Sequence, residues 1–181
     1  MDTIYVLIPV WIAIFIYMVD LGIKKWESYY IIRTYYDTGE LKNEMQIKDL
    51  NLNGITKAYY KSGKLMAETS FVDGKAEGIQ KSYYESGPLD FECTYKDNKL
   101  NGLKKVYYET GQLWYELTYV NDKKHGTYKE YYESGQLKIK MPYVNDKTHG
   151  IVKYYDETGS CTEIEYDNGI IKIPNMTENL E

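Results

Sequence analysis

The chain has 181 residues, enough for one ordinary domain. It carries 22 lysines and arginines against 27 aspartates and glutamates, a net charge of −5, and this balance argues against nucleic acid as a partner, because phosphate sites need clustered positive charge. Tyrosine is abundant, with 22 residues against three each of phenylalanine and tryptophan, and this composition favours strands that are half buried and half wetted.

The first segment, residues 1–23, differs from everything after it. Thr3 to Val19 contains no charge, and a helix extended to Ile23 would span about 31 Å, close to the thickness of a bilayer core. The segment lacks the basic start and the small-residue cleavage site of a secretory signal. We therefore expect one uncleaved transmembrane helix; a buried hydrophobic helix and a cleaved signal are the alternatives.

Basic residues follow this segment and none precedes it. They are Lys24, Lys25 and Arg33. The positive-inside rule then places the rest of a single-pass, membrane-anchored protein in the cytoplasm.

The remaining chain repeats one pattern. A glycine follows a tyrosine pair every 24 residues, and a second glycine opens each unit with the same period. A fixed period of this size indicates a repeat architecture. The last pair, Tyr154-Tyr155, is displaced by one, which we attribute to an extra residue at Glu157. The first set of glycines is Gly39, Gly63, Gly87, Gly111, Gly135 and Gly159, and the second is Gly54, Gly78, Gly102, Gly126 and Gly150.

Apolar and polar residues alternate after each turn glycine. This period of two predicts a strand with one buried face. The glycine supplies one turn of the unit, and Asp-Asn or Asn-Asp pairs supply a second, so each unit is expected to be a β-hairpin. In the third unit the apolar residues are Leu89, Phe91, Cys93 and Tyr95, and the polar residues are Asp90, Glu92 and Thr94.

Recurring opposite charges suggest the register of the hairpins. A four-residue loop, 85–88, would place Lys81 opposite Glu92 and Tyr84 opposite Leu89. A three-residue loop would instead bring Lys81 toward Phe91. The first register also pairs Lys57 with Glu68 and Lys105 with Glu116, but it sets Lys129 against Lys140.

A lone hairpin is marginal in water, so neighbouring units must stack. The expected fold is all-β: an elongated, twisted antiparallel meander of about six hairpin repeats of 24 residues, preceded by one N-terminal transmembrane helix. The expected parts are a transmembrane anchor at 1–23, a linker and first strand at 24–34, the repeat array at 35–169 and a C-terminal tail at 170–181.

The unit reads Gly-x-x-Lys-x-Tyr-Tyr-Glu-Ser-Gly-x-Leu-x-x-Glu-x-x-Tyr-x-Asn. It resembles the bacterial variant of the MORN repeat, and the array is similar to YwqK-family antitoxins over residues 30–169. The resemblance implies an elongated hairpin array with an interaction role, as a toxin-neutralising partner, scaffold or membrane-associated module. It implies no catalytic residues. The N-terminal segment lies outside the family pattern.

A repeated polar surface is the candidate binding site. In the favoured register one tyrosine of each pair points to the wetted face with a lysine beside it. Such a row either covers its own sheet or forms a stripe that binds protein, since tyrosine is common in contact hot spots. The residues are Tyr59, Tyr83, Tyr107, Tyr131, Lys57, Lys81, Lys105 and Lys129.

Other reactive residues indicate no site. Cys93 and Cys161 are expected to be small buried hydrophobes, nearly three units apart and too distant for a disulfide. His125 and His149 would lie about 10 Å apart, too far to share a zinc ion. No catalytic or nucleotide-binding motif is present, so we expect no enzyme, metal or cofactor.

These observations predict a non-catalytic, membrane-anchored module that binds a protein, with a toxin-neutralising antitoxin, immunity protein or scaffold as its specific form. The alternative is a cell-wall carbohydrate-binding repeat protein on the outer side of the membrane. Trp114 is the one tryptophan inside the array, whereas carbohydrate sites usually use paired tryptophans.

Overall fold

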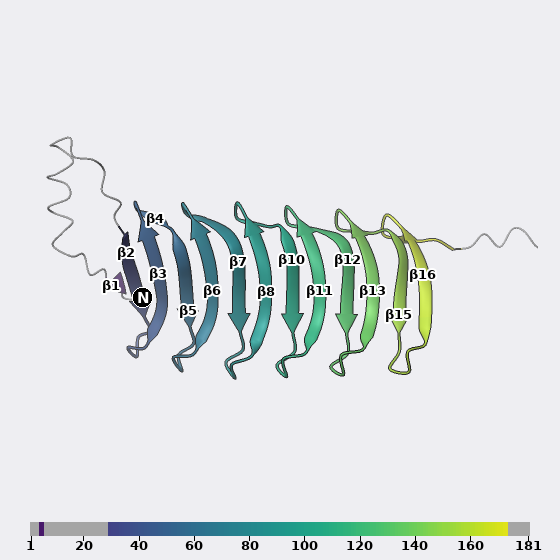
Figure 1. Cartoon of the computed structure of the whole chain (residues 1–181), viewed down its shortest axis with the longest axis horizontal. Helices are drawn as coiled ribbons and strands as arrows, with labels where there is room; N and C mark the ends of the chain where they lie inside the picture. Colours follow the sequence, from purple (N-terminus) through teal and green to yellow (C-terminus); the bar gives the residue numbers. More distant parts are fainter. Residues whose placement is uncertain (1–3, 6–28, 174–181) are drawn as a thin grey trace, which may run out of the picture.

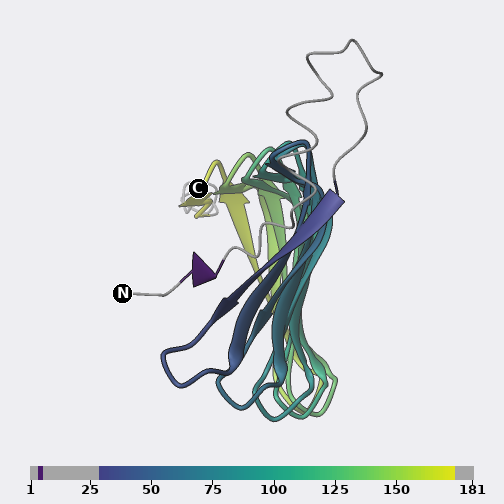
Figure 2. The same ribbon diagram turned by 90° about the vertical axis from the view of Figure 1, so that its left-hand side faces the viewer.

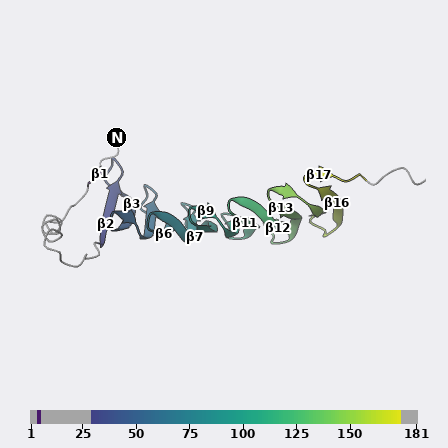
Figure 3. The ribbon, with the colours of Figure 1, turned by 90° about the horizontal axis from the view of Figure 1, so that it is seen from above.

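The computed structural model of the protein describes residues 4–5 and 29–173. All regular elements within these residues are strands, and they form one antiparallel sheet. Successive strands pair in turn along the chain, apart from the adjoining pieces of split strands, so the sheet is an all-β meander, as the hairpin period predicts (Figure 1). The array is long and narrow, and Figure 3 shows the same row of strands from above.

Each unit contributes one strand on either side of its turn glycine. In three units the first strand is split, so that β4 continues into β5, β9 into β10 and β14 into β15. The strands are β1 (Ile4–Tyr5), β2 (Tyr29–Tyr35), β3 (Leu41–Lys48), β4 (Asn51–Leu52), β5 (Gly54–Tyr59), β6 (Leu65–Val72), β7 (Lys75–Tyr83), β8 (Leu89–Lys96), β9 (Lys99–Leu100), β10 (Gly102–Tyr107), β11 (Leu113–Val120), β12 (Lys123–Tyr131), β13 (Leu137–Val144), β14 (Lys147–Thr148), β15 (Gly150–Tyr155), β16 (Cys161–Asp167) and β17 (Ile170–Ile171).

The expected transmembrane helix is wrong for the residues that the structure describes. Ile4 and Tyr5, at the start of the predicted span, form strand β1, which pairs antiparallel with β2. β-branched and aromatic residues suit a strand, and β2 offers them backbone partners at the end of the sheet. No helix in the described part of the chain is long and apolar enough to cross a membrane. The remainder of the predicted span, residues 6–23, lies outside the described residues.

The turn after each tyrosine pair has a three-residue loop. In the third unit the Gly87 amide donates to the Tyr84 carbonyl at 2.9 Å, and the Tyr84 amide donates to the Pro88 carbonyl at 2.9 Å. Gly87 has a φ of +124°, a conformation that strains any residue with a side chain. The loop is thus one residue shorter than the predicted loop 85–88.

The predicted pairing of Lys81 with Glu92 is confirmed, because a β-bulge compensates for the shorter loop, whereas the predicted pairing of Tyr84 with Leu89 is wrong, because Leu89 lies opposite Tyr83. In the third unit the pairing shifts between Ser82 and Tyr83, which brings Lys81 back opposite Glu92. The equivalent pairs are Lys57–Glu68, Lys105–Glu116 and the like-charged Lys129–Lys140.

The turns at the other ends of the strands connect each unit to the one before. In the turn at Asn121-Asp122 both central residues have positive φ, 50° and 68°, as a tight type I′ hairpin requires. The Asp122 amide donates to the Leu100 carbonyl at 2.9 Å, and the Asp122 side chain accepts from the Leu100 amide at 2.8 Å. The same two-way link joins Asn98 to Ala76 and Asp146 to Lys124.

The glycine that opens each unit pairs with an aromatic residue on the neighbouring strand. Gly102 is opposite Tyr119, and a Cβ atom at Gly102 would lie 2.9 Å from the Thr94 Cβ. A ring beside a strand glycine covers backbone that the glycine leaves bare. The equivalent pairs are Gly54–Phe71, Gly78–Tyr95, Gly126–Tyr143 and Gly150–Tyr166.

Burial is concentrated in the middle of strands with neighbours on both sides. Cys93, Val106, Leu117 and Val152 are buried there. No second sheet or helix of the described chain covers the sheet, which is bowed in the end-on view of Figure 2. Cys161 is exposed and not buried as expected, because it lies on β16, where the sheet ends.

Candidate functional site

The register divides the side chains between two faces, because successive residues of a strand point to opposite sides. We call the side that carries Lys81, Glu92 and Lys105 the charged face, and the side that carries Phe91 and Cys93 the aromatic face.

A row of charged residues crosses the charged face perpendicular to the strands. Each residue pairs with the next one on the neighbouring strand, and positive and negative charges alternate from Arg33 to Lys129. Opposite charges across a sheet contribute about 0.2–1 kcal/mol per pair. The row is Arg33, Glu44, Lys57, Glu68, Lys81, Glu92, Lys105, Glu116, Lys129, Lys140, Lys153 and Glu163.

The predicted tyrosines and lysines meet on this face, and each group also contains a glutamate that the sequence predicts as a cross-strand partner of a lysine but not as part of the site. The Tyr83 hydroxyl donates to Glu68 Oε1 at 3.1 Å, and Lys81 Nζ lies 4.0 Å from the same oxygen. We call these units Tyr–Glu–Lys groups. The other two are Tyr107–Glu92–Lys105, with distances of 3.2 and 3.6 Å, and Tyr131–Glu116–Lys129, with distances of 3.4 and 2.8 Å.

The first predicted pair, Tyr59 and Lys57, is arranged differently. The glutamate at the equivalent position, Glu44, is held by Arg33 at 2.8 Å. Lys57 lies between Glu44 and Glu68 in the row. The stripe therefore runs through all four predicted units, but three of them form complete groups.

The tyrosines of these groups and Lys129 keep their protons near neutral pH. Burial, followed by the neighbouring glutamate, raises the pKa of Tyr83, Tyr107 and Tyr131. The hydrogen bond to Glu116 raises the pKa of Lys129. A general acid or base works best with a pKa near the working pH, so these groups suit binding better than proton transfer.

An exposed aliphatic row runs beside the groups on the charged face. Ile79 and Leu103 line a shallow open depression with Glu92, Thr94 and Lys105. These side chains lie on every second strand, opposite polar residues such as Ser70 and Thr94, so they form separate apolar spots beside the charged row, a mixture that suits a contact surface. Its exposed members are Ile31, Ile55, Ile79, Leu103 and Ile151, and Thr127 interrupts it.

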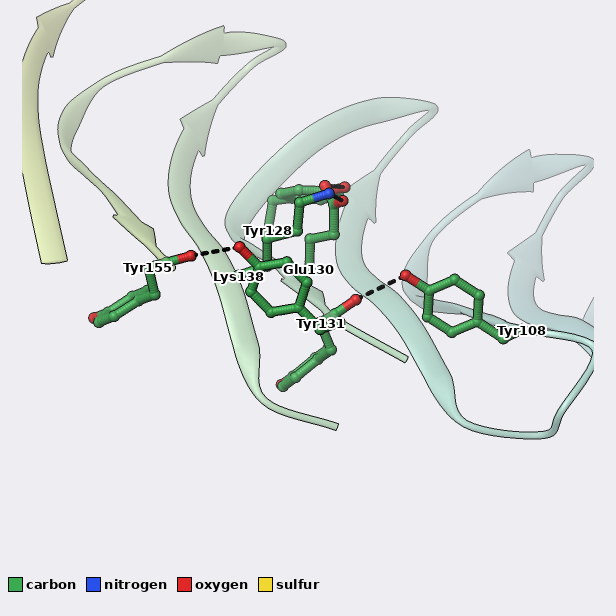
Figure 4. A network of polar contacts seen from close by, with 7 residues as sticks. Tyr108, Tyr128, Glu130, Tyr131, Lys138 and Tyr155 are labelled. Atoms are coloured by element: carbon green, nitrogen blue, oxygen red, sulfur yellow. Dashed lines mark hydrogen bonds and ion pairs between the residues drawn. The ribbon is translucent and has the colours of Figure 1, made fainter. Parts of the chain in front are cut away.

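The second tyrosine of each pair has a structural role. Its hydroxyl donates to the backbone carbonyl of the first tyrosine in the next unit, as Figure 4 shows for Tyr108 and Tyr131. We call this series the tyrosine ladder; it links each unit to its successor near the glycine turns. The bonds are Tyr36 to Tyr59, Tyr60 to Tyr83, Tyr84 to Tyr107, Tyr108 to Tyr131 and Tyr132 to Tyr155, all at 2.7–2.9 Å.

The sixth unit ends the ladder without the extra residue expected at Glu157. The Asp156 amide donates to the Ser160 carbonyl, as the Tyr132 amide does to Gln136 exactly one period earlier. Asp156 therefore occupies the place of the second tyrosine. Its Oδ1 accepts from the amides of Thr158 and Ser160 within its own turn.

An aromatic cluster with a central carboxylate lies on the opposite, aromatic face. Glu130 accepts from the Tyr128 hydroxyl at 2.8 Å and pairs with Lys138 at 2.9 Å (Figure 4). Rings of Tyr128 and Tyr115 lie 5.6 Å apart, and Trp114 contacts Tyr115 at 5.4 Å. Trp114 is 40% exposed, so the cluster reaches solvent.

The carboxylate at its centre stays ionised. Burial raises the pKa of Glu130, but hydrogen bonds from Lys138 and Tyr128 outweigh burial and lower it overall. Burial and the Glu130 hydrogen bond raise the pKa of Tyr128. The sequence contains a signal for this cluster. Glu130 lies one period after Val106, and the residues at the equivalent position of all the other units are uncharged.

The two histidines do not form a common site. His125 lies within β12, and His149 Nδ1 lies 3.2 Å from Asp167 Oδ1. Within the described ranges, no three His, Cys, Asp or Glu side chains gather as metal ligands.

The repeat itself has a known counterpart. The model of the family described as MORN repeat variant matches residues 52–73, 76–97, 100–121 and 124–145. No curated protein matches the chain.

Solved structures share only a partial likeness. A mutant of S. aureus TarM in complex with Fondaparinux, alpha-GlcNAc-glycerol and UDP is 14% identical, with a TM-score of 0.37 over 61% of this chain and 23% of that chain. The GtfA/B complex bound to UDP and GlcNAc is 11% identical, with a TM-score of 0.21 over 91% of this chain and 26% of that chain. The chain thus spans about a quarter of the length of these proteins.

The matched segments follow one another at the 24-residue period of the hairpins, each one covering most of a unit of the sheet. The chain therefore contains an array of four MORN repeat variants.

Proposed function

We propose that the array is a non-catalytic module that binds a protein partner through its charged face. The observation that carries this proposal is the stripe of Tyr–Glu–Lys groups next to the exposed aliphatic row. Tyrosine beside apolar surface is typical of contact hot spots. Equivalent residues repeat about every 10 Å, because each unit adds two strands, so the surface suits a long partner better than a small molecule.

The specific form that we favour is an antitoxin or immunity protein, whose partner is a toxin. This form rests on the resemblance of the repeat unit to YwqK-family antitoxins. A long, repeated surface is suited to covering a large area of another protein, and neutralisation requires such coverage.

The test is capture of partners from the native host by the full-length chain, comparing two double variants. Ile79→Ser with Leu103→Ser removes aliphatic contacts from the charged face. Ile170→Ser with Ile173→Ser makes the same chemical change at exposed positions beyond the stripe. A partner retained by the wild type and the second variant but lost from the first supports the proposal. Equal retention by all three would exclude the charged face.

The aromatic cluster favours a second candidate, carbohydrate binding. Trp114 presents an exposed ring close to the carboxylate of Glu130, and sugars bind by stacking on such rings while their hydroxyls bond to charged groups. Retention of the full-length protein on insoluble cell wall, lost in Trp114→Ala but kept in Trp26→Ala, would support this candidate. Absence of retention by the wild type would exclude it.

A further inference from the structure

The charge row on the charged face breaks its alternation at one place. Lys129, Lys140 and Lys153 stand side by side on β12, β13 and β15. In the preceding units the position of Lys140 is held by a half-buried glutamate, whereas the Lys140 side chain is exposed. These glutamates are Glu44, Glu68, Glu92 and Glu116.

The two flanking lysines reach away from Lys140. Lys129 Nζ lies 2.8 Å from Glu116, and Lys153 Nζ lies 2.6 Å from Glu163, compared with 3.6 and 4.0 Å for the matching contacts in the two earlier groups. Within residues 29–173, no carboxylate lies in ion-pair range of Lys140. An ammonium group therefore remains available at the centre of the three lysines.

The surroundings make this place distinct from the other units. Thr127 interrupts the aliphatic row there and pairs with Pro142, which shares the charged face with Lys140. The chain as a whole has a net charge of −5, so three adjacent lysines are a local exception. The fifth unit thus offers less apolar surface and more positive charge than its neighbours.

We propose that Lys140, with Lys129 and Lys153 on either side, is the docking site for an acidic segment of a protein partner. A carboxylate of that segment takes the place that a glutamate of this chain holds in the other units. Adjacent strands are about 4.8 Å apart, so the carboxylate interacts with the central lysine and lies near both neighbours. The inference rests on the proposed function and specifies the chemistry of the partner.

Repulsion among the three lysines destabilises the free array, and binding of an acidic partner removes that repulsion. Like charges directly opposite each other destabilise a sheet. A bound carboxylate removes this repulsion, and a ligand that binds only the folded state stabilises it. Lys140→Glu therefore has two opposite effects: it stabilises the free protein, and it abolishes the site.

The experiment uses the full-length chain and a fluorescein-labelled peptide of ten glutamates as the probe. Fluorescence anisotropy measures Kd at low and at physiological salt. We expect Lys140→Glu to weaken binding roughly tenfold or more and Lys140→Gln to fall between it and the wild type, since charge complementarity controls such contacts. Lys140→Arg keeps the charge and keeps binding. Lys96→Glu, which makes the same charge change at an exposed position outside the row, also keeps binding.

Thermal unfolding of the same proteins provides the second readout. Lys140→Glu raises the Tm of the free protein, and addition of the peptide raises the Tm of the wild type, Lys140→Arg and Lys96→Glu but not that of Lys140→Glu. Equal peptide affinity of wild type and Lys140→Glu would overturn the inference. So would Lys140-dependent binding of phosphatidylserine vesicles without binding of the peptide.

The results also separate this inference from the proposed function. If a captured partner depends on Ile79 and Leu103 but binds Lys140→Glu normally, the function stands and the acidic docking site is wrong. If the peptide depends on Lys140 but no protein depends on the charged face, the site stands and the proposed function fails.

Discussion

At the scale of the residue, Leu50 occupies a backbone conformation that its side chain disfavours. It is the second central residue of a type I′ turn, with a φ of 69°, and its side chain is 85% exposed. The other turns place glycine, asparagine or aspartate at this position. The residues are Gly74, Asn98, Asp122, Asp146 and Gly169.

Replacing Leu50 with glycine should therefore stabilise the protein. The exposed side chain contributes little packing, and relief of the left-handed conformation is worth about 1 kcal/mol. Urea unfolding followed by circular dichroism measures the change. Leu50→Ala removes nearly the same side chain but keeps the strain, so it serves as the control. A gain in both variants alike would assign the effect to the lost leucine and not to the backbone.

The two cysteines should differ in reactivity. Burial raises the pKa of Cys93, which is 3% exposed, so both access and the fraction of reactive thiolate are low. Cys161 is exposed at the end of the sheet. We expect an alkylating agent at pH 8 to label Cys161 first in the folded protein and both cysteines in urea, as mass spectrometry would show. A Cys93–Cys161 crosslink in the monomer would contradict the linear array.

At the scale of the element, the sequence predicts the pairing of the two strands in a hairpin better than the length of the loop between them. Lys81 and Glu92 reveal the pairing, because opposite charges recur at the same separation in several units. The sequence does not distinguish a four-residue from a three-residue loop, since both accommodate Gly87 and the bulge between Ser82 and Tyr83 restores the same strand register. The role of Glu130 does not follow from alternation, because alternation identifies the face of a residue but not the side chains that it contacts there.

The tyrosine ladder provides a test of how the elements are joined. Tyr84→Phe removes the hydroxyl that donates to the Tyr107 carbonyl at 2.7 Å and leaves the ring in place. A hydrogen bond of this kind contributes about 0.5–1.5 kcal/mol, so the free energy of unfolding should fall by that amount. Tyr108→Phe should behave alike, and the double variant should show at least the sum. Unchanged stability in all three would mean that strand pairing alone holds the units together.

At the scale of the whole molecule, the main links between units repeat with the same period of 24 residues. The turn links, the charge row and the tyrosine ladder all join a unit to its neighbours and to nothing further away. Stability in such arrays is approximately a sum of units and nearest-neighbour interfaces. Ile4 and Tyr5 show the limit of an argument from composition, since apolar residues that suit a helix also suit the strand that they form here.

Deleting one complete unit should leave a folded, shorter array. Removal of residues 78–101 joins Glu77 to Gly102, which takes the place of Gly78, so Tyr60 meets the Tyr107 carbonyl. We expect a strand-type circular dichroism spectrum and a lower m value in urea, because less surface is exposed on unfolding. Removal of residues 90–101 takes away half a unit and reverses every later strand. A folded product from that second deletion would refute the one-dimensional description.

The tyrosine ladder also has a direction. Each hydroxyl reaches toward the carboxyl-terminal neighbour, while Asp156 turns inward and bonds to its own turn. A unit duplicated in the gene before this aspartate keeps all its donors and acceptors, whereas one copied together with the aspartate interrupts the series inside the array. The ladder therefore ends at Asp156, and a unit inserted ahead of this aspartate extends the series without a gap.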